Sequence, residues 1–392
     1  MSALKPYGVN LGGWFCLEDW FYSKSTGAGA GHCVATPNPE YDEASTLSTS
    51  SFVGDVETIF RGLTSEERHQ LARGSFGCEA DLVNLLLKSG FSQGRVVDLF
   101  WQHRRCYIMP LDFARLRTLG IRRVRLPLTW CISYETAYTI RGKDWSGRDT
   151  STSIVPGSHI VEDPLCNDPA FDPSKMRSAS DKWISIPIAA VEHILETAAD
   201  YNIQVLIDIH AFPGGSSAGT FNGVWPNNPR FWSAHRNENF ETIICKLLDW
   251  MELLCHRNPK AFSSLYGLTP MNEPAHLRGL FDEKGAKVPV TYQKAYDDEG
   301  RKNWAAISAT EVLETLAISV KEFRRRPALV DGGKRLVMNI IETAFNGCFG
   351  GEEDAGAFAA SQRGETDAVA GAIGGWWQAV TTEEERRSWA VL

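Results

Sequence analysis

Residues 186–212 read IPIAAVEHILETAADYNIQVLIDIHAF, and this stretch decides the fold. Residues 186–202 carry apolar side chains at helical spacing, which predicts an amphipathic helix. Residues 203–212 form a nearly continuous apolar run, typical of a strand buried on both faces of a parallel sheet. A helix followed directly by such a strand is part of a repeating β/α unit.

The same alternation recurs along most of the chain. Strands are predicted at residues 7–14, 121–130, 203–212, 264–274 and 334–345. Helices are predicted between them at residues 110–120, 186–202, 239–257 and 303–326. Repeated units of this spacing indicate an α/β protein with a parallel sheet, either doubly wound or closed into a (β/α)8 barrel.

Two stretches interrupt the alternation. The first covers residues of about 23–100; it is rich in Ser, Thr, Gly and Pro at its start and then shows short helical patterns. The second covers residues of about 135–180, which are polar and lack periodicity. Both follow the C-terminal end of a predicted strand, where barrel enzymes place the loops that shape their sites. We therefore expect one domain over residues 1–392 with two insertions.

Composition limits the partners. The formal net charge is −8, which argues against nucleic acid or an anionic membrane as the main partner, because both favour Lys/Arg patches. The one basic run, Arg324-Arg325-Arg326, is predicted to end a helix, where cations suit the helix dipole. No apolar run approaches the roughly 20 residues that a membrane span needs. We expect neither a nucleic-acid partner nor a membrane span.

The cysteines and the N-terminus carry little functional signal. The nine cysteines include no C-x-x-C pair, so neither a zinc site nor a dithiol redox site is predicted. We expect no metal and no cofactor. The N-terminus lacks the basic and apolar segments of a secretory signal, which predicts a cytoplasmic protein as written, or a secreted one if its N-terminus is incomplete.

Asn272-Glu273-Pro274 directly follows a short apolar strand. A carboxylate at the C-terminal end of a parallel strand faces the ligand crevice of the sheet, so Glu273 is a candidate catalytic acid. Asn272 beside it supplies a neutral group that can bind a substrate hydroxyl. Taken alone, Asn-Glu-Pro is also compatible with a helix N-cap turn.

Arg125 and His210 lie near the ends of two other predicted strands. A guanidinium in an apolar strand must be paired with carboxylates, because an unpaired buried charge is costly. Arg125 is therefore a candidate for keeping a catalytic carboxylate ionised, and a structural ion pair is the alternative. His210 can hydrogen-bond a sugar hydroxyl or a catalytic acid, although a lone histidine is often structural.

Residues 7–21 read YGVNLGGWFCLEDWF and combine aromatic rings with glycines and acids. A core strand does not need Gly12-Gly13, and a surface loop does not usually carry so many aromatic side chains. The pattern predicts a strand that ends in an aromatic-lined opening of the size of a sugar. Trp14 and Glu18 are its candidate ligand-binding residues.

Residues 215–219, GSSAG, match the G-x-S-x-G pattern of the α/β-hydrolase nucleophile elbow. That elbow needs its serine on a tight turn between a strand and a helix. The sequence TFNGVWPNNP follows Ser217 and cannot form a helix. We therefore exclude a serine hydrolase.

Taken together, these segments resemble glycoside hydrolase family 5, and within it the fungal-type exo-β-1,3-glucanase branch. The resemblance covers nearly all of the chain outside the two insertions. It is carried by residues 8–20 (GVNLGGWFCLEDW), 100–130 (FWQHRRCYIMPLDFARLRTLGIRRVRLPLTW), 199–223 (ADYNIQVLIDIHAFPGGSSAGTFNG), 265–274 (LYGLTPMNEP) and 335–345 (RLVMNIIETAF). It implies a (β/α)8 barrel that hydrolyses β-glucosidic bonds.

The resemblance also implies roles for single residues. Glu273 is the implied general acid/base, and Asn272 is expected to contact the 2-hydroxyl of the sugar. Arg125 is expected to support the nucleophile. The implied substrate-binding residues are Trp14, Glu18, Arg125, His210 and Asn272.

The second carboxylate of a retaining glycosidase is not found. The nucleophile should lie about 5 Å from the acid/base, and the family places it on strand 7 in G-E-[WF], after a strand 6 that ends in H-x-Y. Neither pattern occurs in the sequence. Glu342 is a poor substitute, because it lies near the end of the predicted fifth strand. We therefore expect an incomplete barrel with strands 1–5 present and strands 6–8 missing at the C-terminus.

The predicted function is hydrolysis of β-1,3-glucan or a related β-glucoside by retaining double displacement, with this chain inactive because the nucleophile is missing. A non-catalytic glucan-binding remnant and a glucosylceramide-type β-glucosidase are the alternatives. The complete protein is expected to be a monomer. Linkage preference and exo or endo action stay open.

Overall fold

The structure is a computed structural model of the 392-residue chain. It describes residues 8–17, 33–35, 59, 62–70, 74–76, 79–133, 160–165, 182–216, 231, 235–272, 309–330 and 337–338. The statements below concern these residues.

A parallel five-stranded sheet forms the centre of the fold. Its order is β1 (Gly8–Asn10), β4 (Arg123–Thr129), β7 (Gln204–Ala211), β8 (Leu265–Thr269) and β9 (Val337–Met338). The spatial order follows the chain order, as in a (β/α)8 barrel, whereas a doubly wound sheet reverses direction part-way. The predicted α/β fold of barrel type is confirmed. The prediction that strands 6–8 are missing concerns residues outside the described ones.

Helices connect these strands. They are α6 (Pro110–Thr118), α7 (Ile188–Asp200), α8 (Arg236–Arg257), α9 (Pro259–Ser264), α11 (Ala309–Arg324) and α12 (Pro327–Val330). Local sequence sets their ends: the Asn258 side chain accepts a hydrogen bond from the Ala261 N–H at the start of α9. Gly120 follows α6 with a φ of 85°, the left-handed conformation that favours glycine after a helix. The basic run at residues 324–326 ends α11, as predicted.

The core lies between the sheet and its helices. Successive side chains of a strand point to opposite faces, so one face of β4 and β7 can be wholly apolar. This face carries residues that are at most 1% exposed: Val124, Leu126, Leu128, Val205, Ile207 and Ile209. They belong to one cluster with apolar side chains of α7 and α8. Arg125 and Asp208 belong to the alternate set of positions, on the opposite face of the sheet.

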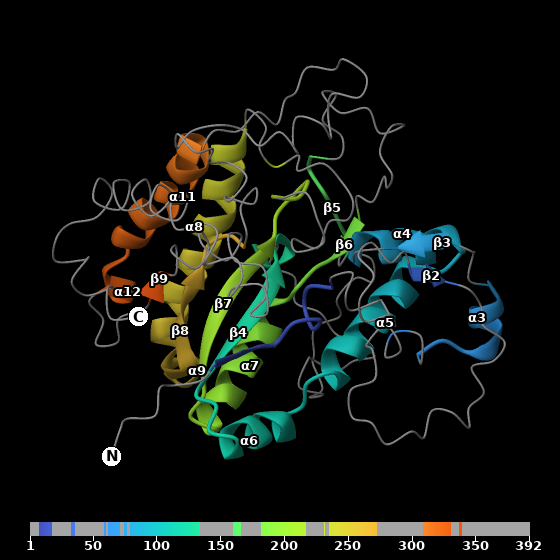
Figure 1. The fold of residues 1–392 in the computed structure, drawn as a ribbon, viewed down its shortest axis with the longest axis horizontal. Coiled ribbons are helices and arrows are strands. Elements are labelled where there is room, and N and C mark those ends of the chain that lie inside the picture. Colours follow the sequence, from blue (N-terminus) through green and yellow to red (C-terminus); the bar gives the residue numbers. More distant parts are fainter. Residues whose placement is uncertain are drawn as a thin grey trace, which may run out of the picture.

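A second apolar cluster is built largely by the segment between β1 and β4. Most of its side chains come from α4 (Glu79–Lys88) and α5 (Gln93–Cys106). The same segment also contains α3 (Ser65–Gln70), which buries none of its residues, and β2 (Cys33–Ala35), which pairs antiparallel with β3 (Gly74–Phe76). The antiparallel pair β5 (Ile160–Glu162) and β6 (Lys182–Ile184) adjoins α4. Figure 1 shows α3, α4 and α5 on one side of the sheet and α8 and α11 on the other.

The buried guanidinium of Arg104 connects this second cluster to the sheet. It donates to the Ser185 carbonyl at 2.8 Å and to Glu79 Oε1 at 3.1 Å. Its charge also lies 5.4 Å from the centre of the Phe15 ring. The Arg104 carbonyl in turn accepts the indole N–H of Trp14 at 2.6 Å. Arg104 therefore holds α4, α5, the end of β6 and the turn after β1 together.

His103 fixes the same turn. Burial lowers the pKa of His103 from 6.5 to about 3, so its ring is neutral. The ring Nε2 lies 2.9 Å from the Gly13 carbonyl oxygen. Because a carbonyl only accepts hydrogen bonds, Nε2 carries the proton and donates it to Gly13.

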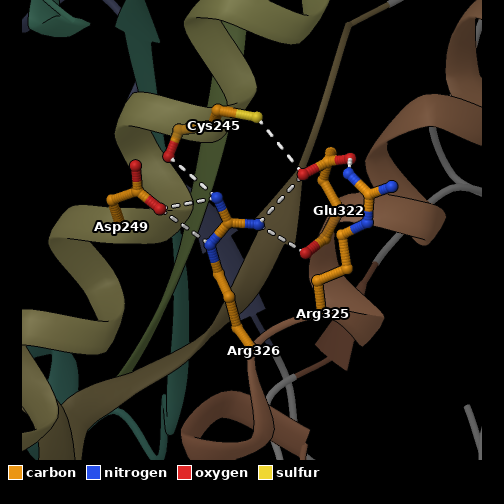
Figure 2. A network of polar contacts seen from close by, with 5 residues as sticks. All are labelled: Cys245, Asp249, Glu322, Arg325 and Arg326. Atoms are coloured by element: carbon orange, nitrogen blue, oxygen red, sulfur yellow. Dashed lines mark hydrogen bonds and ion pairs between the residues drawn. The ribbon is translucent and has the colours of Figure 1, made fainter.

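A polar network joins α8 to the end of α11 (Figure 2). Arg326 donates to Asp249 Oδ1 from Nε at 2.9 Å and from Nη2 at 2.6 Å, and it also pairs with Glu322. Arg325 forms a second ion pair with Glu322, and the Cys245 thiol donates to the same carboxylate at 3.4 Å. These contacts fix the packing of the two helices.

None of the helices in the described part of the chain is long and apolar enough to cross a membrane.

The buried Glu79 predicts a pH dependence of stability. Complete burial raises the pKa of its carboxyl from 4.5 to about 7, against the opposing effect of Arg104. The folded state therefore binds the proton more tightly than the unfolded state, and this stabilisation is complete below pH 4.5 and is lost as the pH rises through 7. The free energy of unfolding of the parent minus that of Glu79→Gln should fall by about 3 kcal/mol between pH 4.5 and 8.

Urea denaturation of both proteins across this range measures the difference. The subtraction removes other titrating groups, because both proteins share them. A difference that is flat, or that rises with pH, would contradict the raised pKa of Glu79.

Candidate active site

Three adjacent strands bring the polar residues together. Arg125 lies in β4, Asp208 and His210 lie in β7, and Asn272 lies just after β8. The Asn272 backbone N–H donates to the Ile209 carbonyl at 3.0 Å, which holds the segment after β8 beside the end of β7. The site therefore stands at the carboxyl end of the parallel sheet, where proteins of this architecture bind ligands.

Four side chains form a closed ring of contacts, which we call the Arg125 ring: Arg125, Asp208, His210 and Asn272. Arg125 Nη2 lies 2.6 Å from Asn272 Oδ1 and 3.1 Å from Asp208 Oδ2. His210 Nδ1 lies 2.7 Å from the same Asp208 oxygen, and Asn272 Nδ2 lies 3.5 Å from His210 Nε2. Each residue thus contacts two others of the ring.

Donors and acceptors alternate consistently around the Arg125 ring. Asp208 Oδ2 accepts from both Arg125 and His210, so the His210 proton is on Nδ1. Nε2 is then an acceptor, which suits the Asn272 amide N–H. The amide oxygen of Asn272 accepts from Arg125 in turn.

The Arg125 ring is buried and neutral overall. Asp208, His210 and Asn272 are 0%, 4% and 2% exposed, while the Arg125 side chain is 18% exposed. One guanidinium and one carboxylate cancel each other in charge. Among the described residues, Asp208 Oδ1 has no hydrogen-bond partner, so Oδ2 makes both contacts to the ring.

The structure brings three of the sequence-predicted site residues together, namely Arg125, His210 and Asn272. Sequence reasoning missed Asp208, although it stands in the quoted strand. The signal was present: Arg125 needed a carboxylate, and an acid two residues before His210 shares its face of the strand.

The other predicted residues divide into two groups. Trp14 is 2% exposed, belongs to the main core cluster and uses its indole N–H on Arg104. It packs against Phe15, with 4.9 Å between the ring centres. Its predicted contact with sugar stays a prediction. The residues Glu18, Ser217, Glu273 and Glu342 lie outside the described part of the chain.

The turn after β7 is held by Asp163, which lies in the second insertion. Gly214 and Gly215 adopt φ values of 69° and 81°, which glycine tolerates without strain. Asp163 is 2% exposed, and its Oδ2 accepts the Gly214 N–H at 2.6 Å while Oδ1 accepts the Leu165 N–H at 2.8 Å. The insertion thereby fixes the loop that directly follows His210.

One group in the described part of the chain could place three metal ligands together: Glu241, Cys245 and Glu322. Glu322 is already paired with Arg325 and Arg326, and burial raises the pKa of the Cys245 thiol (Figure 2). A cation there must compete with two guanidinium groups. We therefore interpret the group as part of the packing between α8 and α11.

Comparisons with known proteins give distant likenesses. No family model matches the chain, and no curated protein matches its sequence. Among solved structures, a rutinosidase from Aspergillus niger is 15% identical, with a TM-score of 0.43 over 89% of this chain. An endo-1,4-β-mannanase from Rhizomucor miehei is 12% identical, with a TM-score of 0.31 over 59% of this chain. An endoglucanase from Pseudomonas stutzeri is 13% identical, with a TM-score of 0.25 over 59% of this chain.

The matched part of these proteins is limited. The chain spans 66% of the rutinosidase, 51% of the mannanase and 48% of the endoglucanase. Likenesses of this strength assign no activity, so the interpretation of the site rests on its own geometry.

Asp163 yields a prediction for the turn after His210. Replacing it by Ala leaves two buried backbone N–H groups without their acceptor, so Asp163→Ala should lower the free energy of unfolding by about 2–4 kcal/mol. Asp200, which forms an exposed pair with Lys260, is the control, and Asp200→Ala should change stability by less than about 0.5 kcal/mol. Equal effects of the two substitutions in urea denaturation would contradict the anchoring role of Asp163.

Proposed function

We propose that the protein is a glycoside hydrolase of β-glucosides, such as β-1,3-glucan, with Glu273 as its general acid/base. The observation that carries the proposal is the Arg125 ring, whose Asn272 directly precedes Glu273 in the sequence. This arrangement fixes a polar group at the carboxyl end of a parallel sheet, and the candidate acid Glu273 is the next residue in the sequence. The motifs of residues 8–20 and 199–223 support the same class.

The charge of the Arg125 ring supports a neutral substrate. Because Asp208 compensates Arg125 at 3.1 Å, the ring does not present an excess positive charge of the kind that binds phosphate or carboxylate ligands. A sugar is bound by hydrogen-bond donors and acceptors in fixed positions, without net charge. The contacts of the Arg125 ring hold the Asn272 amide and the His210 imidazole in such fixed orientations. The names of the similar structures agree with a glycosidase, although the proposal does not rest on them.

In the proposed mechanism, Glu273 protonates the leaving oxygen and then activates water, and Asn272 binds the sugar's 2-hydroxyl. Retention also needs a nucleophilic carboxylate about 5 Å away. Asp208 is unsuitable, because it is buried and engaged by Arg125 and His210. The sequence contains no G-E-[WF] motif, so we expect this chain to bind glucan and to hydrolyse it very slowly.

Calorimetry with a β-1,3-gluco-oligosaccharide tests the proposed binding. The chain should bind it saturably, and Asn272→Ala should weaken binding about tenfold, because a hydrogen bond to the sugar is lost and its partner is left unpaired. Asn84, whose side chain donates to the Ala80 carbonyl within α4, is the matched control, and Asn84→Ala should leave affinity unchanged. Absence of binding, or equal affinities for all three proteins, would count against the proposal.

Hydrolysis of laminarin and an aryl β-glucoside tests the catalytic part. Residual turnover should disappear in Glu273→Gln while oligosaccharide binding is retained. Rapid turnover that Glu342→Ala abolishes would show that the nucleophile lies in this chain and would overturn the expectation of slow hydrolysis.

A further inference from the structure

The position of one proton on His210 determines whether the Arg125 ring can close. Nδ1 lies 2.7 Å from a carboxylate oxygen of Asp208, whereas Nε2 faces the amide nitrogen of Asn272 at 3.5 Å. An amide nitrogen only donates and an ionised carboxylate only accepts. These partners are matched only when the imidazole is neutral and carries its proton on Nδ1.

We propose that Asp208 is a positioning residue, which holds His210 in the Nδ1–H tautomer and thereby, together with Arg125, fixes the amide orientation of Asn272. Asp208 does not contact Asn272 in any described hydrogen bond. It acts through two neighbours, since its Oδ2 accepts from His210 on one side and from Arg125 on the other.

The opposite tautomer is incompatible with these contacts. A proton on His210 Nε2 points at the Asn272 N–H₂ group, which places two donors against each other. Rotating the amide by half a turn relieves that clash, but it then directs the N–H₂ group at the Arg125 guanidinium, 2.6 Å from the present Oδ1 position. The tautomer of His210 and the orientation of Asn272 are therefore coupled.

Burial strengthens this coupling. Asp208 is fully buried and His210 is 4% exposed, so little water is available to replace a lost hydrogen bond. Exchanging a hydrogen bond inside the ring for two donors that face each other costs about 1–3 kcal/mol. That cost is enough to keep a single tautomer dominant.

We call the hold of Asp208 on the Nδ1–H form of His210 the tautomer lock. The lock rests on the described contacts alone, whereas its effect on sugar binding rests on the function proposed above. Asn272 is the residue proposed to bind the 2-hydroxyl, so a rotated amide presents a donor where an acceptor is needed, or the reverse. Asp208 should therefore influence affinity for the oligosaccharide without touching it.

Nitrogen-15 NMR of the imidazole rings tests the lock directly. Long-range ¹H–¹⁵N correlation distinguishes the two tautomers and the cation, and the spectrum of His210→Gln identifies the His210 signals. At pH 7.5 the parent chain should show a protonated Nδ1 and an unprotonated Nε2. A protonated Nε2 in the parent, in either the neutral or the charged ring, would overturn the proposal.

Variants at Asp208 test its role as the cause. Asp208→Ala removes the acceptor of the Nδ1 proton, whereas Arg125 still holds the Asn272 amide oxygen, so the share of the Nδ1–H form should fall without disappearing. The double variant Arg125→Met/Asp208→Ala removes both charges together, which protects folding, and should show the same change. Asp249→Ala, which removes the carboxylate partner of Arg326 on α8, should leave the His210 signals unchanged. A share of the Nδ1–H form that is the same in both Asp208 variants as in the parent would overturn the proposal.

The binding measurement separates the two proposals. Asp208→Ala should weaken oligosaccharide binding about tenfold, as Asn272→Ala does, while Asp249→Ala should not. A parent that shows the expected tautomer but binds no oligosaccharide supports the lock and counts against the glycosidase. A parent that binds the oligosaccharide but has His210 protonated on Nε2 supports the glycosidase and counts against the lock.

Discussion

A guanidinium within a parallel strand is the constraint on which the site depends. Arg125 is charged at any physiological pH, and its strand is otherwise apolar at most positions. The neighbouring strand supplies Asp208 at 3.1 Å, and the segment after β8 supplies the Asn272 carbonyl at 2.6 Å. Three strands must therefore align before Arg125 has both its carboxylate and its amide acceptor. The contacts of the Arg125 ring therefore depend on the register of the parallel sheet.

A second guanidinium, that of Arg104, plays a comparable part away from the site. Arg104 is fully buried and contacts Glu79, the carbonyl of Ser185 and the ring of Phe15. These partners come from the turn after β1, from the first insertion and from the residue that follows β6, so Arg104 fixes long connections that could otherwise move. The protein thus places its apolar side chains between sheet and helices, and it uses paired charges where loops and strands meet.

Much of this organisation is readable from the sequence. Repeated strand and helix patterns predict the parallel sheet, and strand-end positions single out Arg125 and Asn272. Asp208 was not found, although its two-residue spacing from His210 was readable; only the register between β4 and β7 brings Asp208 beside Arg125. Arg104 was not found either, since its partners are far away in the chain. Trp14 lies in the core. A run of aromatic residues in a sequence does not show whether the rings pack in the core or line a binding surface.

A double-mutant cycle on the free energy of unfolding measures the compensation of Arg125 most directly. It compares the parent with Arg125→Met, Asp208→Asn and the double variant, by urea denaturation at pH 7. Each single change leaves one buried group without its partner, so the pair should show a coupling energy of about 2–3 kcal/mol. A coupling energy below about 0.5 kcal/mol would contradict the view that the Arg125–Asp208 pair holds the strand ends together.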